Sequence, residues 1–479
     1  MNLLKRGSGV LMHVSSLWGE YGIGSFGKSA KEWIDVIFKM GFSYWQVLPF
    51  CITDEYNSPY KSFSAFSINP YFIDLDLLYN DGLLLKDELQ AVKQNSPYLC
   101  EFERLKKERL PLLKKASERF KDWDKIDAFL KENPHTEKFC LFMALKDANK
   151  NKRWTDWETD TFNESTLKTW QFTQYIAFAQ WLEIKSYANK KGVQIIGDIP
   201  IYVSDDSADV WSNPENFLLD KKGKPRLVAG VPPDYFCADG QLWGNPLYNW
   251  PKMKKDGFSW WKDRMNFMCK LFDGVRIDHF RGLESYFAIC ANETTAKNGK
   301  WVKGPGMAFI NAIKTVTENK LIIAEDLGDI TPEVRALVEK SGFPGMAVLQ
   351  FGFLGDDNSP HLPHNYKNNL VSYTGTHDNN TLLGFMWEND EQTKQKILDY
   401  FGYVGDWNSC YDSILRAMFA SNADLMILPL QDLLLYGNDT RLNKPGNALN
   451  NWAFRITKEQ IDTINKEKFL KWNTMYSRI

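Results

Sequence analysis

The stretch "FDGVRIDHFRG" (residues 272–282) begins like a buried strand and ends in charged residues. Val275 and Ile277 supply the β-branched side chains that strands favour. Successive side chains of a strand point to opposite faces, so Arg276 and Asp278 share the face opposite to Val275 and Ile277. A guanidinium and a carboxylate two residues apart, on a face that should be buried, indicate a polar site at the end of this strand.

Similar short runs recur along the chain and alternate with stretches of helical periodicity. The β-rich runs are residues 9–14, 44–50, 193–201, 272–278, 320–326, 346–353, 370–376 and 423–430. Amphipathic stretches that end in glycine lie between many of them, at residues 29–41, 177–192, 331–342 and 391–402. Repeated units of strand and helix predict an α/β fold, a parallel (β/α)8 TIM barrel, with residues 1–479 forming one catalytic body.

Two connections, at residues 49–193 and 201–272, are far longer than the ~2–6 residues usual between a strand and its helix. We therefore expect inserted subdomains after strands 2 and 3. The first, at about residues 75–175, has charge-rich helical patterns. The second, at about residues 204–270, is rich in Gly, Pro and aromatic residues, which predicts mostly loop.

The composition excludes several classes of protein. With 44% hydrophobic and 25% charged residues, the 479-residue chain is typical of a globular protein. Its net charge of −2 predicts no nucleic-acid partner and no membrane partner. The N-terminus lacks the apolar core of a signal peptide, and no apolar run reaches the ~18 residues of a membrane span. Seven scattered cysteines without CxxC spacing predict no disulfide framework and no zinc site, so we expect a cytoplasmic protein.

Aromatic residues make up 14% of the chain, and 18 of them are Trp. Many stand beside Asp, Asn and Gln, as in "DYFCADGQLWGNPLYNW" (residues 234–250). Aromatic faces next to carboxylates and amides suit a ligand with apolar faces and many hydroxyls, such as a sugar. Core packing is the alternative for any single Trp.

Three of the predicted strands end in carboxylates, Asp278, Glu325 and Asp378. Because the active site of a barrel lies at the C-terminal ends of its strands, the three acids should meet at one mouth. Cleavage of a glycosidic bond with retention uses a nucleophilic carboxylate and a protonated acid. Arg276 would keep Asp278 ionised, as a nucleophile requires, whereas Glu325 has no basic neighbour in sequence and could act as acid and base. Strand-end caps and salt bridges are the alternative for any one of these acids.

The sequence resembles the 4-α-glucanotransferases (amylomaltases or disproportionating enzymes), glycoside hydrolase family 77 of the α-amylase clan, over nearly the whole chain. The motifs that carry the resemblance include "SGVLMHVSSL" (8–17), "SPYKSFSAFSINPYFIDL" (58–75), "GDIPIYVSDDSADVW" (197–211), "VAGVPPDYFCADGQLWGNPLY" (228–248), "AEDLG" (324–328), "YTGTHDNNT" (373–381) and "LNKPGNALNNW" (442–452). The resemblance implies a hexosyltransferase that moves a segment of an α-1,4-glucan to the 4-hydroxyl of glucose or another glucan by a retaining double displacement. Its partners would be maltooligosaccharides, amylose, and starch or glycogen fragments, with no cofactor and no metal.

Carried over to this sequence, the resemblance makes Asp278 the nucleophile, Glu325 the acid/base and Asp378 the transition-state stabiliser, with Arg276 and His377 beside them. The substrate-binding residues that it implies are Tyr60 and Asp198 in the donor site, Tyr235 and Trp243 in a loop over the acceptor side, and Ser58, Asp234, Phe236 and His279 on the same motifs.

Two other functions stay open at this point. One is an α-amylase-like hydrolase, against which the 228–248 motif speaks, and the other is a non-catalytic glucan-binding barrel, against which the three acids speak. The stretch "GVPPDYFCADGQLWGN" (230–245) combines glycines with aromatic residues, which favours a lid that covers the acceptor and excludes water. The oligomeric state cannot be inferred from the sequence.

Overall fold

The computed structural model describes residues 4–233, 238–447 and 449–479. Eight parallel strands form its central sheet: β1 (Gly7–Leu11), β2 (Tyr44–Gln46), β3 (Gln194–Ile199), β6 (Gly274–Ile277), β9 (Leu321–Ala324), β10 (Gly345–Val348), β11 (Leu370–Tyr373) and β12 (Leu425–Pro429). Their order is β10-β11-β12-β1-β2-β3-β6-β9. The two outer strands of this order approach each other, since the Ala324 N–H donates to the Pro344 carbonyl at 2.9 Å. The predicted parallel barrel is thus confirmed.

Each predicted β-rich run overlaps one of these strands, but only the first three residues of the run 346–353 are strand. β10 ends at Val348, and Leu349–Leu354 form the short helix α13. The strand and most of the helix are buried here, so the apolar run carries no periodicity that could mark the change.

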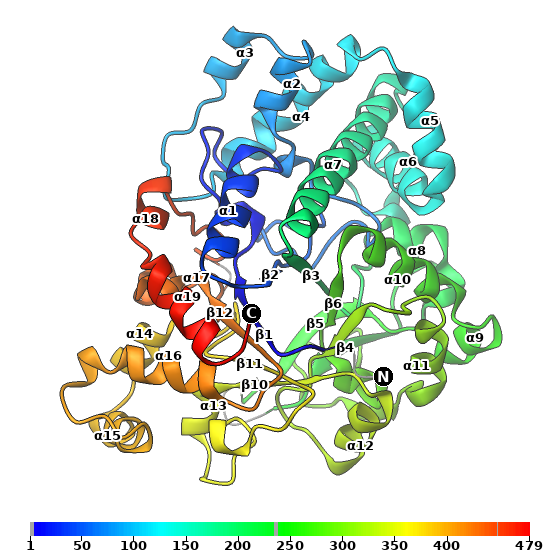
Figure 1. Cartoon of the computed structure of the whole chain (residues 1–479). Coiled ribbons are helices and arrows are strands. Elements are labelled where there is room, and N and C mark those ends of the chain that lie inside the picture. The colour runs from blue at the N-terminus through cyan, green and yellow to red at the C-terminus, as the bar shows by residue number, and fades with distance from the viewer. Residues whose placement is uncertain (1–3, 234–237, 448) are drawn as a thin grey trace.

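Helices surround the sheet (Figure 1). Those of the barrel layer are α1 (Lys28–Lys39), α7 (Glu164–Lys190), α10 (Ser259–Leu271), α11 (Gly306–Lys314), α12 (Pro332–Ser341), α14 (Leu382–Glu388), α15 (Glu391–Tyr400), α16 (Tyr411–Ala420), α17 (Leu430–Leu434), α18 (Lys458–Asp462) and α19 (Lys466–Met475). The apolar stripe of α1, with Trp33, Ile34 and Ile37 fully buried, faces the core. Gly41 and Gly342 end α1 and α12 with φ of 75° and 68°, a conformation that favours glycine.

The insertion after β2 is helical, with α2 (Leu75–Asn80), α3 (Lys86–Ala91), α4 (Phe102–Arg119), α5 (Trp123–Glu132) and α6 (Pro134–Ala148), which lie at the top of Figure 1. It packs on the N-terminal part of α7, a single 27-residue helix that continues into the barrel layer. Trp181 of α7 is fully buried and meets the ring of Phe50 at 4.5 Å between centroids. Buried residues of α4, α5 and α6 belong to the same hydrophobic cluster as those of the barrel strands, so the insertion shares a core with the barrel.

The segment 204–270 has more regular structure than its composition predicts. It contains α8 (Ala208–Ser212), β4 (Leu227–Val231), β5 (Gln241–Pro246) and α9 (Trp250–Lys255) before α10 begins. β4 and β5 join β7 (Ser285–Cys290) and β8 (Lys300–Lys303), which follow β6, in an antiparallel sheet of order β5-β4-β7-β8. Sequence reasoning missed this sheet because its edge strands are exposed or only partly buried over most of their length and carry no continuous apolar run.

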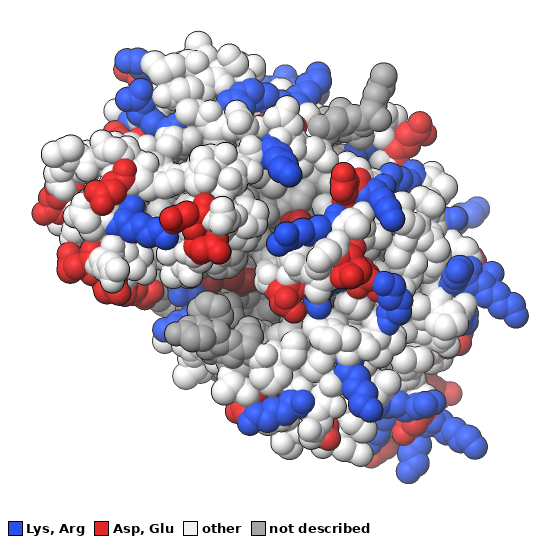
Figure 2. All heavy atoms as spheres, turned by 90° about the horizontal axis from the view of Figure 1, so that it is seen from below, with Lys and Arg blue, Asp and Glu red and all other residues white. Residues whose placement is uncertain are grey.

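Among the described residues, no helix combines the length and apolar character needed to cross a membrane. On the face shown in Figure 2, Lys and Arg are interspersed with Asp and Glu.

Candidate active site

The three acids predicted from the sequence lie at the C-terminal ends of barrel strands. Asp278 directly follows β6 and Glu325 directly follows β9, and the pairing of Ile277 with Ala324 places the two acids on neighbouring strands. Asp378 lies in the loop between β11 and α14. Asp278 and Asp378 line the same open cavity of about 540 Å³. Glu325, only 9% exposed, is not among the residues that line this cavity, but it lies near enough to Asp278 for the charge of that residue to act on it.

The side chain of Asp278 is held by an arginine, as the spacing in β6 predicts. Arg276 donates from Nη2 to Asp278 Oδ1 at 2.7 Å and from Nη1 to Asp198 Oδ2. Tyr60 donates its hydroxyl to the same Asp198 oxygen at 2.7 Å. Burial lowers the pKa of Arg276, but the charges of Asp198 and Asp278 outweigh it and raise that pKa well above its ordinary value. The guanidinium therefore stays charged beside Asp278.

Glu325 has a different environment, made of backbone donors. Its Oε2 accepts from the His279 N–H at 2.6 Å, and its Oε1 accepts from the Leu327 N–H at 2.9 Å. Burial and then the nearby charge of Asp278 raise the pKa of Glu325 to about 8, although Arg276 and the two N–H donors act in the opposite direction. A carboxyl group with this pKa is protonated at neutral pH and can donate a proton.

The backbone at His279 makes one of these bonds possible. This residue adopts a left-handed conformation with φ of 51°, which is uncommon for a residue with a side chain. Its ring packs edge-on against Trp243 of β5, with 4.9 Å between centroids. Trp243 of the antiparallel sheet thus packs against His279, the second residue after β6, whose N–H donates to Glu325.

Asp378 is fixed by a segment more than sixty positions further along the chain. Asn443 donates from Nδ2 to Asp378 Oδ1 at 2.6 Å, and Arg441 donates from Nη2 to the Asp378 carbonyl at 2.5 Å. His377 Nε2 lies 3.3 Å from the same Oδ1. Sequence reasoning did not single out Arg441 or Asn443, and the only signal was that Asn443 stands in the motif "LNKPGNALNNW".

Aromatic rings form one wall of the open cavity. Tyr60 and His377 stack with 5.1 Å between centroids and 13° between planes, and Trp452 packs against both at 5.8 Å. Trp243, Tyr60 and Ser58 line the cavity, and the Ser58 hydroxyl accepts from the Tyr60 N–H at 3.3 Å. Sequence reasoning missed Trp452, although it too lies in the motif at 442–452.

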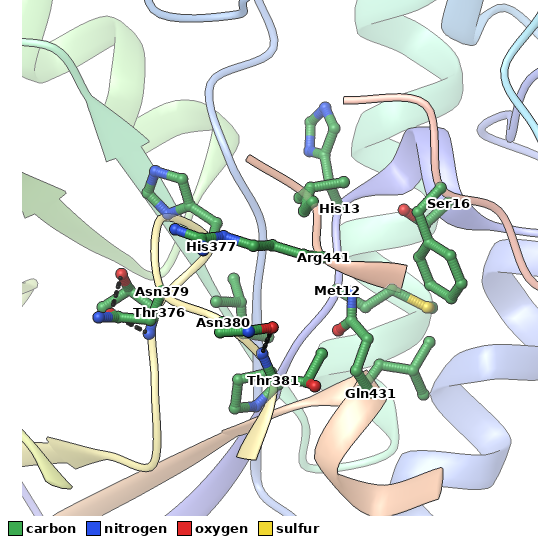
Figure 3. A pocket seen from close by; sticks show the side chains of 15 residues that line it. Met12, His13, Ser16, Thr376, His377, Asn379, Asn380, Thr381, Gln431 and Arg441 are labelled. Carbon is green, nitrogen blue, oxygen red and sulfur yellow. Dashed lines mark hydrogen bonds between the residues drawn. The ribbon is translucent and has the colours of Figure 1, made fainter. Parts of the chain in front are cut away.

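A second, much smaller cavity of about 20 Å³ lies behind His377 (Figure 3). His13, Thr376, Asn380 and Arg441 are among its lining residues. Burial lowers the pKa of His13 to about 3, with His377 acting in the same direction, so His13 is neutral. The volume and polar lining suit one bound water molecule.

Three predicted substrate-binding residues, Asp234, Tyr235 and Phe236, lie outside the described residues. In the part of the chain that the structure describes, no group of three or more His, Cys, Asp and Glu side chains is arranged to hold a metal ion.

A TIM barrel with carboxylates at neighbouring strand ends and an open cavity lined with aromatic rings defines an enzyme of the glycosidase and transglycosidase class. Residues 12–461 match the family model described as 4-alpha-glucanotransferase, glycoside hydrolase family 77. The chain belongs to this family and is a glucanotransferase.

Individual relatives agree with this assignment. The chain is 43% identical to the 4-alpha-glucanotransferase of Clostridium butyricum, over 98% of this chain and 100% of that protein. It is 40% identical to that of Thermus thermophilus, over 95% of each. Among solved structures, the amylomaltase from Streptococcus agalactiae in complex with acarbose superimposes with a TM-score of 0.95 at 38% identity, covering 99% of this chain and 100% of the other.

Proposed function

We propose that this glucanotransferase acts on α-1,4-glucans with Asp278 as nucleophile, Glu325 as acid and base, and Asp378 as stabiliser of the transition state. The observation that supports these roles best is the contrast between neighbouring strand ends. Asp278 is paired with a charged Arg276, whereas burial raises the pKa of Glu325 to about 8. A double displacement needs one ionised and one protonated carboxyl group.

In the first step, an Asp278 oxygen attacks the anomeric carbon and the glycosidic C–O bond breaks. Glu325 gives its proton to the leaving oxygen, and the non-reducing part of the glucan remains as an ester on Asp278. In the second step, the Glu325 carboxylate takes the proton of an acceptor 4-hydroxyl, whose oxygen attacks the same carbon and releases Asp278. Two inversions give net retention of the anomeric configuration.

The wall around Asp378 supports an oligosaccharide as the occupant. Stacked Tyr60 and His377 offer ring faces to a sugar, and Asp378 offers an acceptor for its hydroxyls. The side chain of Asp198 is fully buried, and we propose that it contributes by holding Tyr60 and Arg276 in place. We further propose that Ser58, Trp243 and His279 shape this site, and that Asp234, Tyr235 and Phe236 contribute to the acceptor side. The relative from Streptococcus agalactiae was solved with acarbose bound, which fits an oligosaccharide ligand.

Incubation with maltotriose tests the function. Transfer produces glucose and a ladder of longer oligomers while the number of reducing ends stays constant. A rise in reducing ends without the ladder would instead indicate an α-amylase-type hydrolase, and binding without new products would indicate a non-catalytic barrel.

We also propose that the substrate is a cytoplasmic maltodextrin derived from starch or glycogen. Six cysteines, Cys51, Cys100, Cys140, Cys269, Cys290 and Cys410, are free thiols in the described residues. Free thiols are typical of proteins in a reducing compartment. Two measurements test this location. The protein should be found in the cytoplasmic fraction of the cell, and its activity should be unchanged in a reducing buffer.

A further inference from the structure

Two short segments far apart in sequence, residues 377–378 and 441–443, are joined by several hydrogen bonds. The Asn443 N–H donates to the His377 carbonyl at 3.1 Å, and its side chain donates to Asp378 Oδ1 at 2.6 Å. Arg441 donates from Nη2 to the Asp378 carbonyl at 2.5 Å and from Nε to the Asn443 carbonyl at 2.8 Å. Both the backbone and the carboxylate of Asp378 are therefore fixed from the same segment.

Arg441 is suited to this task by its shape. The planar guanidinium reaches two carbonyl oxygens in fixed directions, whereas a lysine ammonium is a point donor on a flexible stem. Figure 3 shows Arg441 along the small cavity, with its head group towards His377. Burial lowers the pKa of Arg441, and the charges of Glu388 and Asp378 act in the opposite direction.

Asn443 acts on the carboxylate itself. Its side-chain amide donates to Oδ1 of Asp378, and His377 Nε2 lies close to the same oxygen. The other oxygen, Oδ2, is therefore the one available to a sugar hydroxyl. A hydrogen bond to one carboxylate oxygen fixes the direction of the other. Asp378 needs such support because its side chain is 44% exposed and lies on a loop.

We infer that Arg441 and Asn443 are positioning residues of the transfer reaction, which hold Asp378 in the orientation that the transition state requires. This inference rests on the proposed role of Asp378. Because they act through a group whose contact strengthens in the transition state, their loss lowers kcat more than it raises KM.

The test uses Asn443→Asp in the full-length protein with maltotriose. The substitution keeps the shape but places two carboxylates within hydrogen-bond distance, so the pair must share a proton. We expect kcat at neutral pH to fall about 10²-fold with KM changed less than about threefold. We also expect the deficit to shrink as the pH falls, because the shared proton restores the hydrogen bond.

Asn438→Asp is the matched control, because it adds the same charge to the same segment at an exposed position. We expect its kcat and KM to stay near the wild-type values. Arg441→Lys provides a second variant that does not depend on the folding of the first, with Arg416→Lys, at an exposed arginine, as its control. We expect Arg441→Lys to lower kcat about tenfold with little change in KM.

Asp378→Asn separates the possible failures. If Asp378→Asn stays active, the proposed role of Asp378 is wrong. If Asp378→Asn is inactive while Asn443→Asp and Arg441→Lys keep wild-type kcat, only the positioning role is wrong. A loss in Asn443→Asp that is independent of pH and equally large in KM would assign Asn443 to substrate binding instead, and would also overturn the inference.

Discussion

Asp278 and Glu325 stand at equivalent positions on neighbouring strands, yet their surroundings differ. The side chain of Asp278 is 29% exposed and is paired with Arg276. Glu325 is 9% exposed and accepts only backbone N–H groups among its hydrogen bonds in the described chain. Arg276 also lowers the pKa of Glu325, but burial and the charge of Asp278 outweigh it. One arginine thus lies near both acids but forms an ion pair with Asp278 alone, and it does not prevent burial from raising the pKa of Glu325.

The largest effect is expected when the acid that is paired with arginine, Asp278, is replaced. We expect Asp278→Asn to lower transfer from maltotriose by roughly 10⁵-fold or more, because no nucleophile remains to form the ester. The amide has the same shape, so folding and glucan binding should persist, as measured by thermal unfolding and by calorimetric titration. Near-normal transfer by this variant would refute the assignment.

Removing the protonated member should have a smaller effect. We expect Glu325→Gln to lower transfer about 10³-fold, the range found for loss of a general acid and base. Formation of the ester should be almost normal with an aryl glucoside whose leaving group needs no proton. Glu318→Gln, at an exposed acid before β9, is the control. Equal losses with both kinds of donor would argue against an acid role for Glu325.

The pH profile of the wild-type enzyme tests the raised pKa of Glu325 directly. Glu325 has a pKa of about 8 and must be protonated for the first step, so kcat/KM should fall by about tenfold per pH unit above that value. Below it the acid form predominates, and this group imposes no loss. The alkaline limb should vanish in Glu325→Gln, and its persistence there would assign it to another group.

The sequence predicts the barrel well because its strands are buried on both faces and consist of short β-branched runs between turn signals. It does not predict β5 and β8, whose residues are mostly exposed or only partly buried and form no continuous apolar run, and it does not predict their partners. Pairing of β4 with β7 depends on tertiary structure rather than on a local pattern.

The same limit applies to the candidate site. Arg276 and Asp278 share a strand face, so their ion pair follows from the alternation of side chains. The absence of a basic neighbour in sequence suggests a raised pKa for Glu325, but the physical cause is burial, and Arg276 is close enough to oppose it. Arg441 and Asn443 reach Asp378 from a distant loop, and no periodicity in the sequence encodes that approach.

The smallest effect is expected for substitution of Trp243, which is linked to Glu325 through His279. The Trp243 ring lines the open cavity and packs on the ring of His279. The backbone N–H of His279 donates to Glu325. In Trp243→Ala, water should enter next to Glu325. Since burial is the main cause of the raised pKa, the alkaline limb should move to lower pH.

Water that enters there should also compete with the acceptor sugar, which must otherwise win by its position against a solvent present at about 55 M. We expect total transfer by Trp243→Ala to fall roughly tenfold, while the ratio of new reducing ends to transferred glucosyl units rises severalfold. Trp301→Ala makes the same truncation in β8, away from the residues that line the cavity, and should leave the ratio unchanged.

The ratio is measured from both products of one maltotriose digest, and the position of the alkaline limb is measured from the pH series. If Trp243→Ala moves neither while its folding is intact, this ring has a packing role and burial of Glu325 depends on other residues. If it moves the limb but not the ratio, the pKa of Glu325 and the exclusion of water from the ester are controlled by different parts of the site.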